Sequence, residues 1–441
     1  MNPKLNDLIE SFQSKRWFPG KYPDPYGELL DYLSLEAITN LVEDWQNTGS
    51  RTTLATAYYL LRLLPSLVFK DLHSDLVKAA KDPVDTGVPA HHVFYYIRSF
   101  PLQRSANVWN KLKEWADRWE SVLFDWLTAE IRLDHSFPEV VQKLTPPQSG
   151  SLEKELSASR ELFSLKLQRT VASAGLREIV SAFRLRNRDG IADWSDFAAF
   201  ARTIIENGDL KKSPSLQKNA EDAAAQVLFP IAPPARVLLE YGEAAGPVDA
   251  LRFLFEFGKG LFYTGIDPDS PADHRISGDP GLPCFWGSIY ANLMTDRSSL
   301  QRLISPAAED LADEMNLVLE FWYRSDAFLA LYRENANASL DNLKDVYLRA
   351  FESAFSFHAP DFLYLYELLR SAESPFRARA MKHAIAAVER FRELYGRHWF
   401  ANPRYVRRVR EYWWNGFALT STEILADLGV PDPTDYPFIG T

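Results

Sequence analysis

Helical periodicity is the feature that most restricts the fold of this 441-residue chain. Apolar residues recur every three or four positions through residues 53–80 and 105–131, and again through residues 381–396. This spacing gathers apolar side chains on one side of a helix, so each segment predicts an amphipathic helix packed on a core. The chain is long enough to bury a sizeable core. We therefore expect a mainly α-helical fold.

Local signals for helix ends agree with this periodicity. Ser305 and Pro306 have the residue types of an N-cap and a first helical position. Residues 420–423, TSTE, have the spacing of a capping box, in which the first and last side chains each bond the backbone of the other. Gly396 ends the third periodic segment and predicts a C-cap.

One region predicts β-strands. Residues 227–231 and 236–241 are two short β-prone runs, joined by a connection that contains two prolines. Proline cannot donate a hydrogen bond to a neighbouring strand, which favours an edge strand or a hairpin corner. The residues that follow, up to 265, predict a helix. A small β element therefore precedes one apolar helix.

A turn-rich segment divides the chain. Residues 144–151, LTPPQSGS, combine proline, glycine and serine between two helical regions. We expect an N-terminal helical lobe over residues 1–145 and a second body over residues 152–441. The second body would hold the edge strands near 227–241 and the apolar helix near 248–263.

Composition excludes several classes of protein. The net charge of −10 argues against a general nucleic-acid binder. A single cysteine, Cys284, excludes an intramolecular disulfide and a cysteine-based zinc cluster, and is typical of a reducing compartment. The sequence has no run of about 18 apolar residues, so it predicts no membrane span. Its first residues lack the pattern of a secretory signal. We expect a cytoplasmic protein with no nucleic-acid or membrane partner.

The arginine-rich segment 404–414, RYVRRVREYWW, allows two interpretations. Arginines interleaved with aromatic residues could form a nucleic-acid stripe. Because the whole chain is acidic, a solvated helix face is the favoured interpretation. Trp413 and Trp414 are most simply explained as packing residues.

Residues 253–263, FLFEFGKGLFY, have part of the zinc-binding H-E-x-x-H pattern. Glu256 and Gly258 are present, but Phe255 and Lys259 occupy the two histidine positions. In the intact pattern, two histidines four residues apart share a helix face and reach one ion, while the glutamate polarises its water. Taken alone, the segment is more simply an aromatic core helix that happens to contain glutamate and lysine. Glu256 and Lys259 could also form a structural ion pair, because they are three residues apart.

The order of a hairpin, this helix, a glycine-rich loop and a further helix resembles the gluzincin metallopeptidases of the thimet oligopeptidase and oligoendopeptidase type. The resemblance covers about residues 225–430 and implies a two-lobed, mainly α fold around a deep cleft with a small β element. The loop at Gly278–Asp279 matches the family loop that precedes the third zinc ligand. That ligand position falls on Cys284.

The resemblance implies that all three protein ligands are replaced, at Phe255, Lys259 and Cys284. Phenylalanine has no donor atom, the lysine ammonium repels a cation, and one thiolate cannot hold catalytic zinc alone. We therefore expect no metal and no cofactor. His274 and His358 are possible replacement ligands, although a hydrogen-bonding role in a loop or core is the favoured interpretation of each. Cys284 is more simply a buried apolar residue than a nucleophile.

A second segment, residues 356–369, resembles the family region whose histidine and tyrosines line the cleft. His358, Tyr364 and Tyr366 are its nearest matches. Phe255, Cys284 and Trp286 would contact the ligand.

Three functional hypotheses follow. The first is a metal-independent enzyme in a repurposed peptidase-like chamber, with Glu256 as acid and base, Lys259 as its cationic partner, and His358, Tyr364 and Tyr366 contacting polar groups. Proton transfer, condensation or cyclisation of a small or peptide-derived ligand would suit this site. The second is a non-catalytic pseudopeptidase that binds a peptide or protein partner. The third and least favoured is an active metallopeptidase with unusual ligands.

Overall fold

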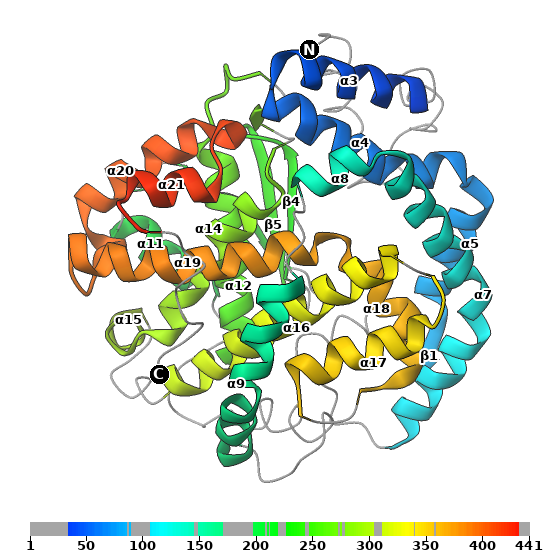
Figure 1. Ribbon diagram of the computed structural model, residues 1–441. Helices are drawn as coiled ribbons and strands as arrows, with labels where there is room; N and C mark the ends of the chain where they lie inside the picture. Colours follow the sequence, from blue (N-terminus) through cyan, green and yellow to red (C-terminus); the bar gives the residue numbers. More distant parts are fainter. Residues whose placement is uncertain are drawn as a thin grey trace. The chain divides into compact units, whose positions relative to one another are not determined.

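A computed structural model of the protein describes part of the chain. The described residues are 34–85, 88–89, 106–144, 149–170, 197–207, 210, 212–218, 226–242, 247–271, 274–275, 278–303, 311–338, 340–356 and 359–431. The proposed cap at Ser305 and Pro306 lies outside these residues. Over the described residues the fold is mainly α-helical with a small β element, as predicted (Figure 1).

The chain forms two compact units, and each is assembled from segments distant in sequence. Unit 1 comprises Met1–Ala57, Asn187–Glu320 and Arg379–Thr441. Unit 2 comprises Tyr58–Arg186 and Phe321–Ala378. The predicted domains, residues 1–145 and 152–441, are each one continuous range of the chain. This division stays a prediction.

Unit 1 contains a three-stranded sheet. Its strands are β3 (Ser215–Lys218), β4 (Gln226–Ala232) and β5 (Arg236–Tyr241), in the order β3-β5-β4. The central strand β5 is antiparallel to β4 and parallel to β3. The two predicted strands are therefore confirmed, and β4, which carries Pro230, is at an edge as the proline required. The strand β3 was not predicted.

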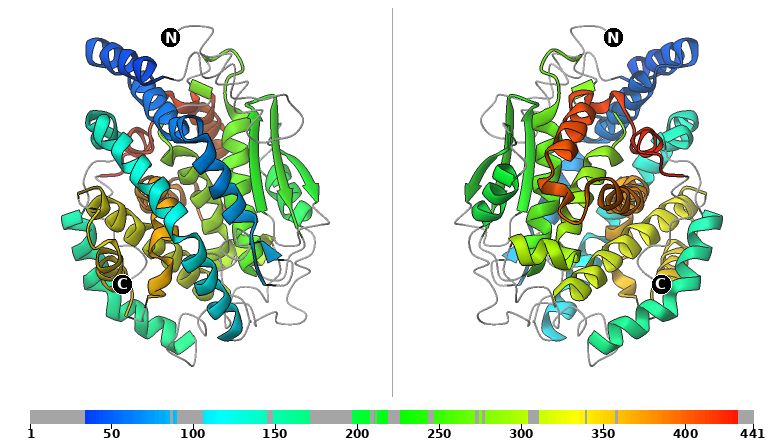
Figure 2. Two further views of the ribbon diagram at one scale, coloured as in Figure 1. Left: turned by 90° about the vertical axis from the view of Figure 1, so that its right-hand side faces the viewer. Right: turned by 90° about the vertical axis from the view of Figure 1, so that its left-hand side faces the viewer.

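The helix α12 (Pro247–Gly265) covers one face of this sheet (Figures 1 and 2). The ring of Phe253 packs edge-on against Tyr241 of β5, with 5.8 Å between centroids. Phe253, Phe257 and Leu261 are fully buried. A helix with apolar residues on most of its circumference is stable only when it is enclosed, so α12 is the central element of unit 1.

The helix α14 (Gly281–Ala291) packs on α12 at unusually close range. A Cβ atom at Gly258 would lie 2.7 Å from the carbonyl oxygen of Trp286. A Cβ atom at Gly287 would lie 2.6 Å from the carbonyl oxygen of Phe255. Real Cβ atoms do not approach backbone so closely, so these two glycines allow the helices to meet backbone to backbone.

The C-terminal helices complete unit 1. Thr420 and Glu423 form the predicted capping box at the start of α21 (Ser421–Asp427). Gly396 has a φ of +84°, as its predicted C-cap role requires. Trp413, in α20 (Pro403–Trp414), packs edge-on against Trp286 with 5.7 Å between centroids. The other helices with residues in unit 1 are α3 (Leu35–Thr48), α4 (Arg51–Val68), α11 (Phe197–Asn207), α15 (Arg297–Leu303), α16 (Ala312–Ala338) and α19 (Ser374–Tyr395).

The described residues of unit 2 are mainly helical and include the short strands β1 (Pro83–Asp85) and β2 (Val88–Pro89). Its helices include the rest of α4, α16 and α19, together with α5 (Lys70–Lys81), α7 (Ala106–Ser136), α8 (Pro138–Leu144), α9 (Ser149–Thr170), α17 (Leu343–Ala354) and α18 (Tyr364–Arg370). The periodic segment 53–80 is not one helix but two, because the chain breaks at Phe69 between α4 and α5. None of the described helices of either unit is long and apolar enough to cross a bilayer.

Unit 2 contains a group of buried, paired charges. Arg333 donates to Asp134 at 2.9 Å and to Glu130 at 3.2 Å. Arg62 bonds the other oxygen of Asp134. Burial alone would raise the pKa of Asp134, but Arg62 and Arg333 hold it below its usual value.

The close approach of α12 and α14 predicts a large difference between two glycines of the same helix. We expect Gly258→Ala to destabilise the protein by about 1–3 kcal/mol, because the new methyl group meets a backbone carbonyl. Gly260→Ala is the control and should cost less, because its nearest neighbours are side-chain atoms of Pro214 and Leu228. Urea unfolding followed by circular dichroism measures both, and an equal loss in the two variants would contradict this account.

Candidate functional site

α12 places the carboxylate of Glu256 beside the amine of Lys259, one helical turn away. Nζ of Lys259 lies 2.8 Å from Oε2 of Glu256, within ion-pair distance. The same Nζ lies 5.5 Å from the centroid of the Phe255 ring, within the range of a cation–π contact. The side chains of Lys259 and Glu256 keep 23% and 18% of their surface exposed, so a ligand can reach the pair from solvent.

α14 contacts α12 at Phe255 and Lys259, the two positions that correspond to histidines. The Cβ position of Gly287 is 3.0 Å from Cγ of Lys259, in addition to its contact with the carbonyl oxygen of Phe255. Cys284 precedes Gly287 by three residues and therefore lies on the same side of α14, one turn away. The thiol of Cys284 is buried. Phe255 and Lys259 therefore both lie against Gly287. The convergence of Cys284 with these two positions, which the resemblance implies, stays a prediction.

The loop before α14 is held by a carboxylate. Oδ1 of Asp279 accepts a hydrogen bond from the backbone N–H of Gly281 at 2.9 Å and one from Arg379 at 3.0 Å. Gly278 lies against the side chain of Phe417, which leaves no room for a Cβ atom. The sequence marked Gly278 and Asp279, but it gave no signal for Arg379, because this partner lies 100 residues further along the chain.

Trp286 faces the core rather than the Glu256–Lys259 pair. Its ring is fully buried and packs against Trp413 and Tyr412 of α20. Its indole Nε1 has no hydrogen-bond partner among the described residues. Nearby, burial raises the pKa of Tyr290 well above its usual value, so this phenol stays neutral. The role of Trp286 as a ligand contact stays a prediction, and its burial gives it no support.

Tyr364 and Tyr366 are in unit 2. The hydroxyl of Tyr364 donates to Glu120 at 2.8 Å, and burial together with this bond raises the pKa of Tyr364 to about 12. The ring of Tyr366 packs edge-on against Trp115 with 6.0 Å between centroids. His358 lies outside the described residues. The roles predicted for these three residues stay predictions.

The residues at the metal-ligand positions do not fit a catalytic zinc ion. Phe255 offers a ring in place of a donor nitrogen, and the ammonium of Lys259 already forms the ion pair with Glu256. Cys284 alone would leave the ion short of the three protein ligands that a catalytic site needs. Over the described residues, His274 included, no group of three or more histidine, cysteine, aspartate or glutamate side chains could hold a metal ion. No chemical step through a metal is therefore assigned to this site.

The fold is similar to solved structures of two peptidases. PZ peptidase A, solved with an inhibitor, matches with a TM-score of 0.61 and 10% identity over 99% of this chain and 85% of that chain. A putative oligoendopeptidase F matches with a TM-score of 0.61 and 11% identity over 98% of this chain and 83% of that chain. No family model matches the sequence, and no curated protein matches it either. The chain therefore has the helical, two-lobed fold of gluzincin-type peptidases.

The partial burial of the Glu256–Lys259 pair predicts a measurable coupling energy. In a double-mutant cycle of Glu256→Gln and Lys259→Met, we expect a coupling of about 0.5–1 kcal/mol, at the upper end for exposed ion pairs. Arg390 and Glu393 are the matched control, because they form an ion pair of 2.7 Å with the same spacing on α19 and are more exposed. Urea unfolding gives both couplings, and a stronger coupling in the control pair would contradict the expected order.

The resemblance predicts that the three positions converge, and therefore that a zinc site can be restored. We expect a variant with Phe255→His, Lys259→His and Cys284→Glu to bind about one zinc ion per chain, because it supplies two imidazoles and a carboxylate. Mass spectrometry of the metal content after dialysis against zinc measures this, with circular dichroism as a check on folding.

The variant with Phe255→His and Cys284→Glu alone is the control. It keeps Lys259, whose ammonium repels the ion, and should bind no stoichiometric zinc. A folded triple variant without zinc would show that the three positions do not converge as the resemblance implies.

Proposed function

We propose that this chain is a metal-independent enzyme that performs acid–base chemistry on a small or peptide-derived substrate. The observation that supports the proposal best is the Glu256–Lys259 pair, a carboxylate and an ammonium 2.8 Å apart at the position of a peptidase metal motif and open to solvent on one side. The peptidase-like fold supports a chamber around this site. Zinc-dependent peptide hydrolysis forms no part of the proposal.

In such a site the two groups have complementary roles. Glu256 accepts a proton from an N–H, O–H or acidic C–H group of the substrate as that atom becomes a nucleophile. The ammonium of Lys259 donates a hydrogen bond to the substrate oxygen on which negative charge develops. Glu256 then returns the proton to the leaving group or to the product, which leaves the enzyme unchanged. Proton transfer, condensation and cyclisation share this sequence of steps.

One observation favours a second candidate, a pseudopeptidase that binds a peptide or protein partner without chemistry. The carboxylate of Glu256 is already neutralised by Lys259, and the ammonium also lies over the Phe255 ring. A pair whose charges are balanced in this way can be structural. The two candidates differ in whether Glu256 takes a proton from the bound ligand and returns it.

The enzyme proposal predicts that Glu256→Gln removes turnover while the fold is kept. Glutamine preserves shape but cannot accept the proton, and loss of a general base typically lowers the rate by about 10²–10⁴-fold. Purified protein would be incubated with a panel of dipeptides and N-acyl amino acids in D₂O. Mass spectrometry then detects deuterium incorporation or the loss of water.

Glu393→Gln is the matched control, because Glu393 also forms an ion pair three residues from its partner, and it should leave turnover unchanged. Chelation by EDTA should also leave turnover unchanged. If wild-type protein binds members of the panel with no isotope exchange or product, the pseudopeptidase candidate replaces the enzyme.

A further inference from the structure

A carboxylate, an aromatic ring and a stretch of helix backbone contact the side chain of Lys259. Its Nζ lies 2.8 Å from Oε2 of Glu256 and 5.5 Å from the centroid of the Phe255 ring. The Cβ position of Gly287 is 3.0 Å from Cγ of Lys259 and 3.1 Å from Cδ2 of Phe255. The backbone of α14 therefore lies against the stem of the lysine, while the carboxylate and the ring lie at its charged end.

The Phe255 ring adds an attraction that the ion pair alone does not have. An aromatic ring attracts a cation through the negative charge on its face, and the attraction grows as water is excluded. Lys259 and Glu256 are both partly buried, so water screens their charges only in part. Since an ion pair must offset the loss of lysine rotamers, a second attraction on the same nitrogen restricts the ammonium to one place.

A pair on α5 shows what the same spacing gives without a ring. Nζ of Lys78 lies 2.6 Å from Oδ1 of Asp75, in the same order and with the same three-residue interval. Ser74 takes the place that Phe255 has before Glu256, and Lys78 forms no cation–π contact with the described part of the chain. The Lys78 side chain is 65% exposed, so only the spacing is shared with the α12 pair.

A cation on α20 also lies near a ring, but two carboxylates share it. The guanidinium carbon of Arg408 is 5.1 Å from the centroid of the Tyr412 ring. Arg408 donates to Glu411 at 2.9 Å and also pairs with Asp427. Because two negative charges already hold this guanidinium, its ring is not needed to fix its position. Lys259 has one carboxylate, Glu256, as its ion-pair partner among the described ion pairs, so the ring is the second element that directs it.

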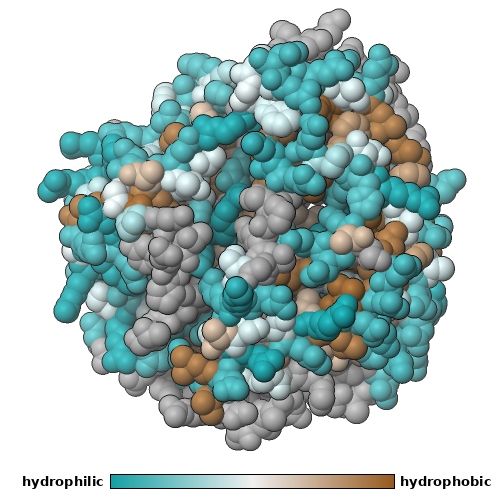
Figure 3. Space-filling view, in the orientation of Figure 1, coloured by the Kyte–Doolittle hydropathy of each residue, from teal (hydrophilic) through white to brown (hydrophobic). Residues whose placement is uncertain are grey.

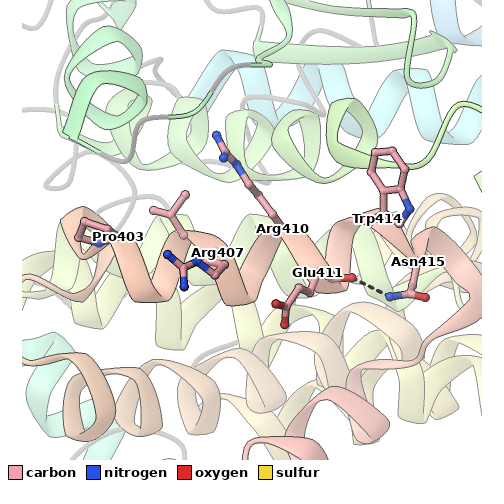
Figure 4. A pocket seen from close by; sticks show the side chains of 7 residues that line it. Pro403, Arg407, Arg410, Glu411, Trp414 and Asn415 are labelled. Atoms are coloured by element: carbon pink, nitrogen blue, oxygen red, sulfur yellow. Dashed lines mark hydrogen bonds between the residues drawn. The ribbon is translucent and has the colours of Figure 1, made fainter.

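The surroundings of the α20 pair are open to water. Glu411 lines a pocket of about 540 Å³ together with Arg410 and Trp414 (Figure 4). Trp414 is 51% exposed, whereas the adjacent Trp413 is 2% exposed, so the packing role predicted from sequence is correct for Trp413 and wrong for Trp414. The described surface over α19 to α21 is otherwise largely hydrophilic (Figure 3). Water screens charges there more than at the partly buried α12 pair.

We propose that Phe255 is a positioning residue of the candidate site, whose ring holds the ammonium of Lys259 beside Glu256 and ready to bond the substrate oxygen. This inference rests on the proposed function, because the substrate oxygen belongs to that reaction. Phe255 acts through Lys259 and needs no contact with the substrate. A donor that is fixed before negative charge develops requires no reorganisation during the reaction, which is how preorganised donors accelerate a step.

NMR of the lysine side chains tests the position of the ammonium without a substrate. Protons over the face of an aromatic ring are shifted upfield by its ring current, so in protein with isotopically labelled lysine the ε-methylene signal of Lys259 should lie upfield of that of Lys78. Phe255→Leu should bring the two signals together, and Phe255→Tyr should restore the difference. Lys259→Arg assigns the signal. Phe255→Met replaces Phe255→Leu if circular dichroism shows that the latter is unfolded.

Kinetics test the consequence for the reaction. With a substrate found by the deuterium assay, Phe255→Leu should lower kcat by about two- to fivefold, the size of a partly exposed cation–π contact. It should leave KM within about twofold, because the donor acts on charge that develops after binding. Phe255→Tyr should restore kcat. Ser74→Leu on α5 is the matched control and should change neither constant.

Three results would overturn the proposal. They are coincident signals of Lys259 and Lys78 in the wild-type protein, a Lys259 signal that Phe255→Leu does not move, and a Phe255→Leu variant that raises KM with kcat unchanged. The last would make Phe255 a ligand contact. Failure of the proposed function looks different: the upfield Lys259 signal depends on Phe255, which supports the position of the ammonium, but no substrate exchanges a proton.

Discussion

The backbone contact between α12 and α14 is the constraint on which the rest of unit 1 depends. Gly258 and Gly287 let each helix reach a carbonyl oxygen of the other. This contact fixes the positions of Phe255 and Lys259 relative to α14. It also turns Trp286 away from the ion pair and into the core against α20. A longer distance between the helices would separate Gly287 from Phe255 and Lys259 and expose the apolar side of α12.

The local signals of the sequence were sufficient for most of the fold. Helices, the β4–β5 hairpin and the capping box at Thr420 depend on residues close together in the chain, and each was confirmed. The strand β3 was missed, because its four residues are mostly exposed and show no alternation, and its partner β5 is parallel and comes later in the chain. The break at Phe69 was missed because the nearest proline, Pro65, lies four residues earlier, inside α4.

The sequence predicted the residues of the motif in the candidate site but not their contacts with other elements. The spacing of Glu256 and Lys259 on one helix allowed their ion pair to be foreseen as one interpretation. The contact of Gly287 with Phe255 and the bond from Arg379 to Asp279 were not foreseen. Both join elements that are distant in sequence, and a pattern of residue types contains no information about which distant elements meet.

The charge balance of the site explains why a glutamate can persist where the metal ligands are absent. A zinc ion would compensate the carboxylate of Glu256 with positive charge, and without any cation this partly buried carboxylate would carry a desolvation cost. Lys259 supplies one positive charge at 2.8 Å, and the Phe255 ring supports the ammonium. The ion pair therefore accounts for the glutamate in both candidate functions, the enzyme and the pseudopeptidase. A structural ion pair and a catalytic pair differ in one property, which is proton transfer between Glu256 and the bound ligand. Evidence for catalysis must therefore come from that proton transfer.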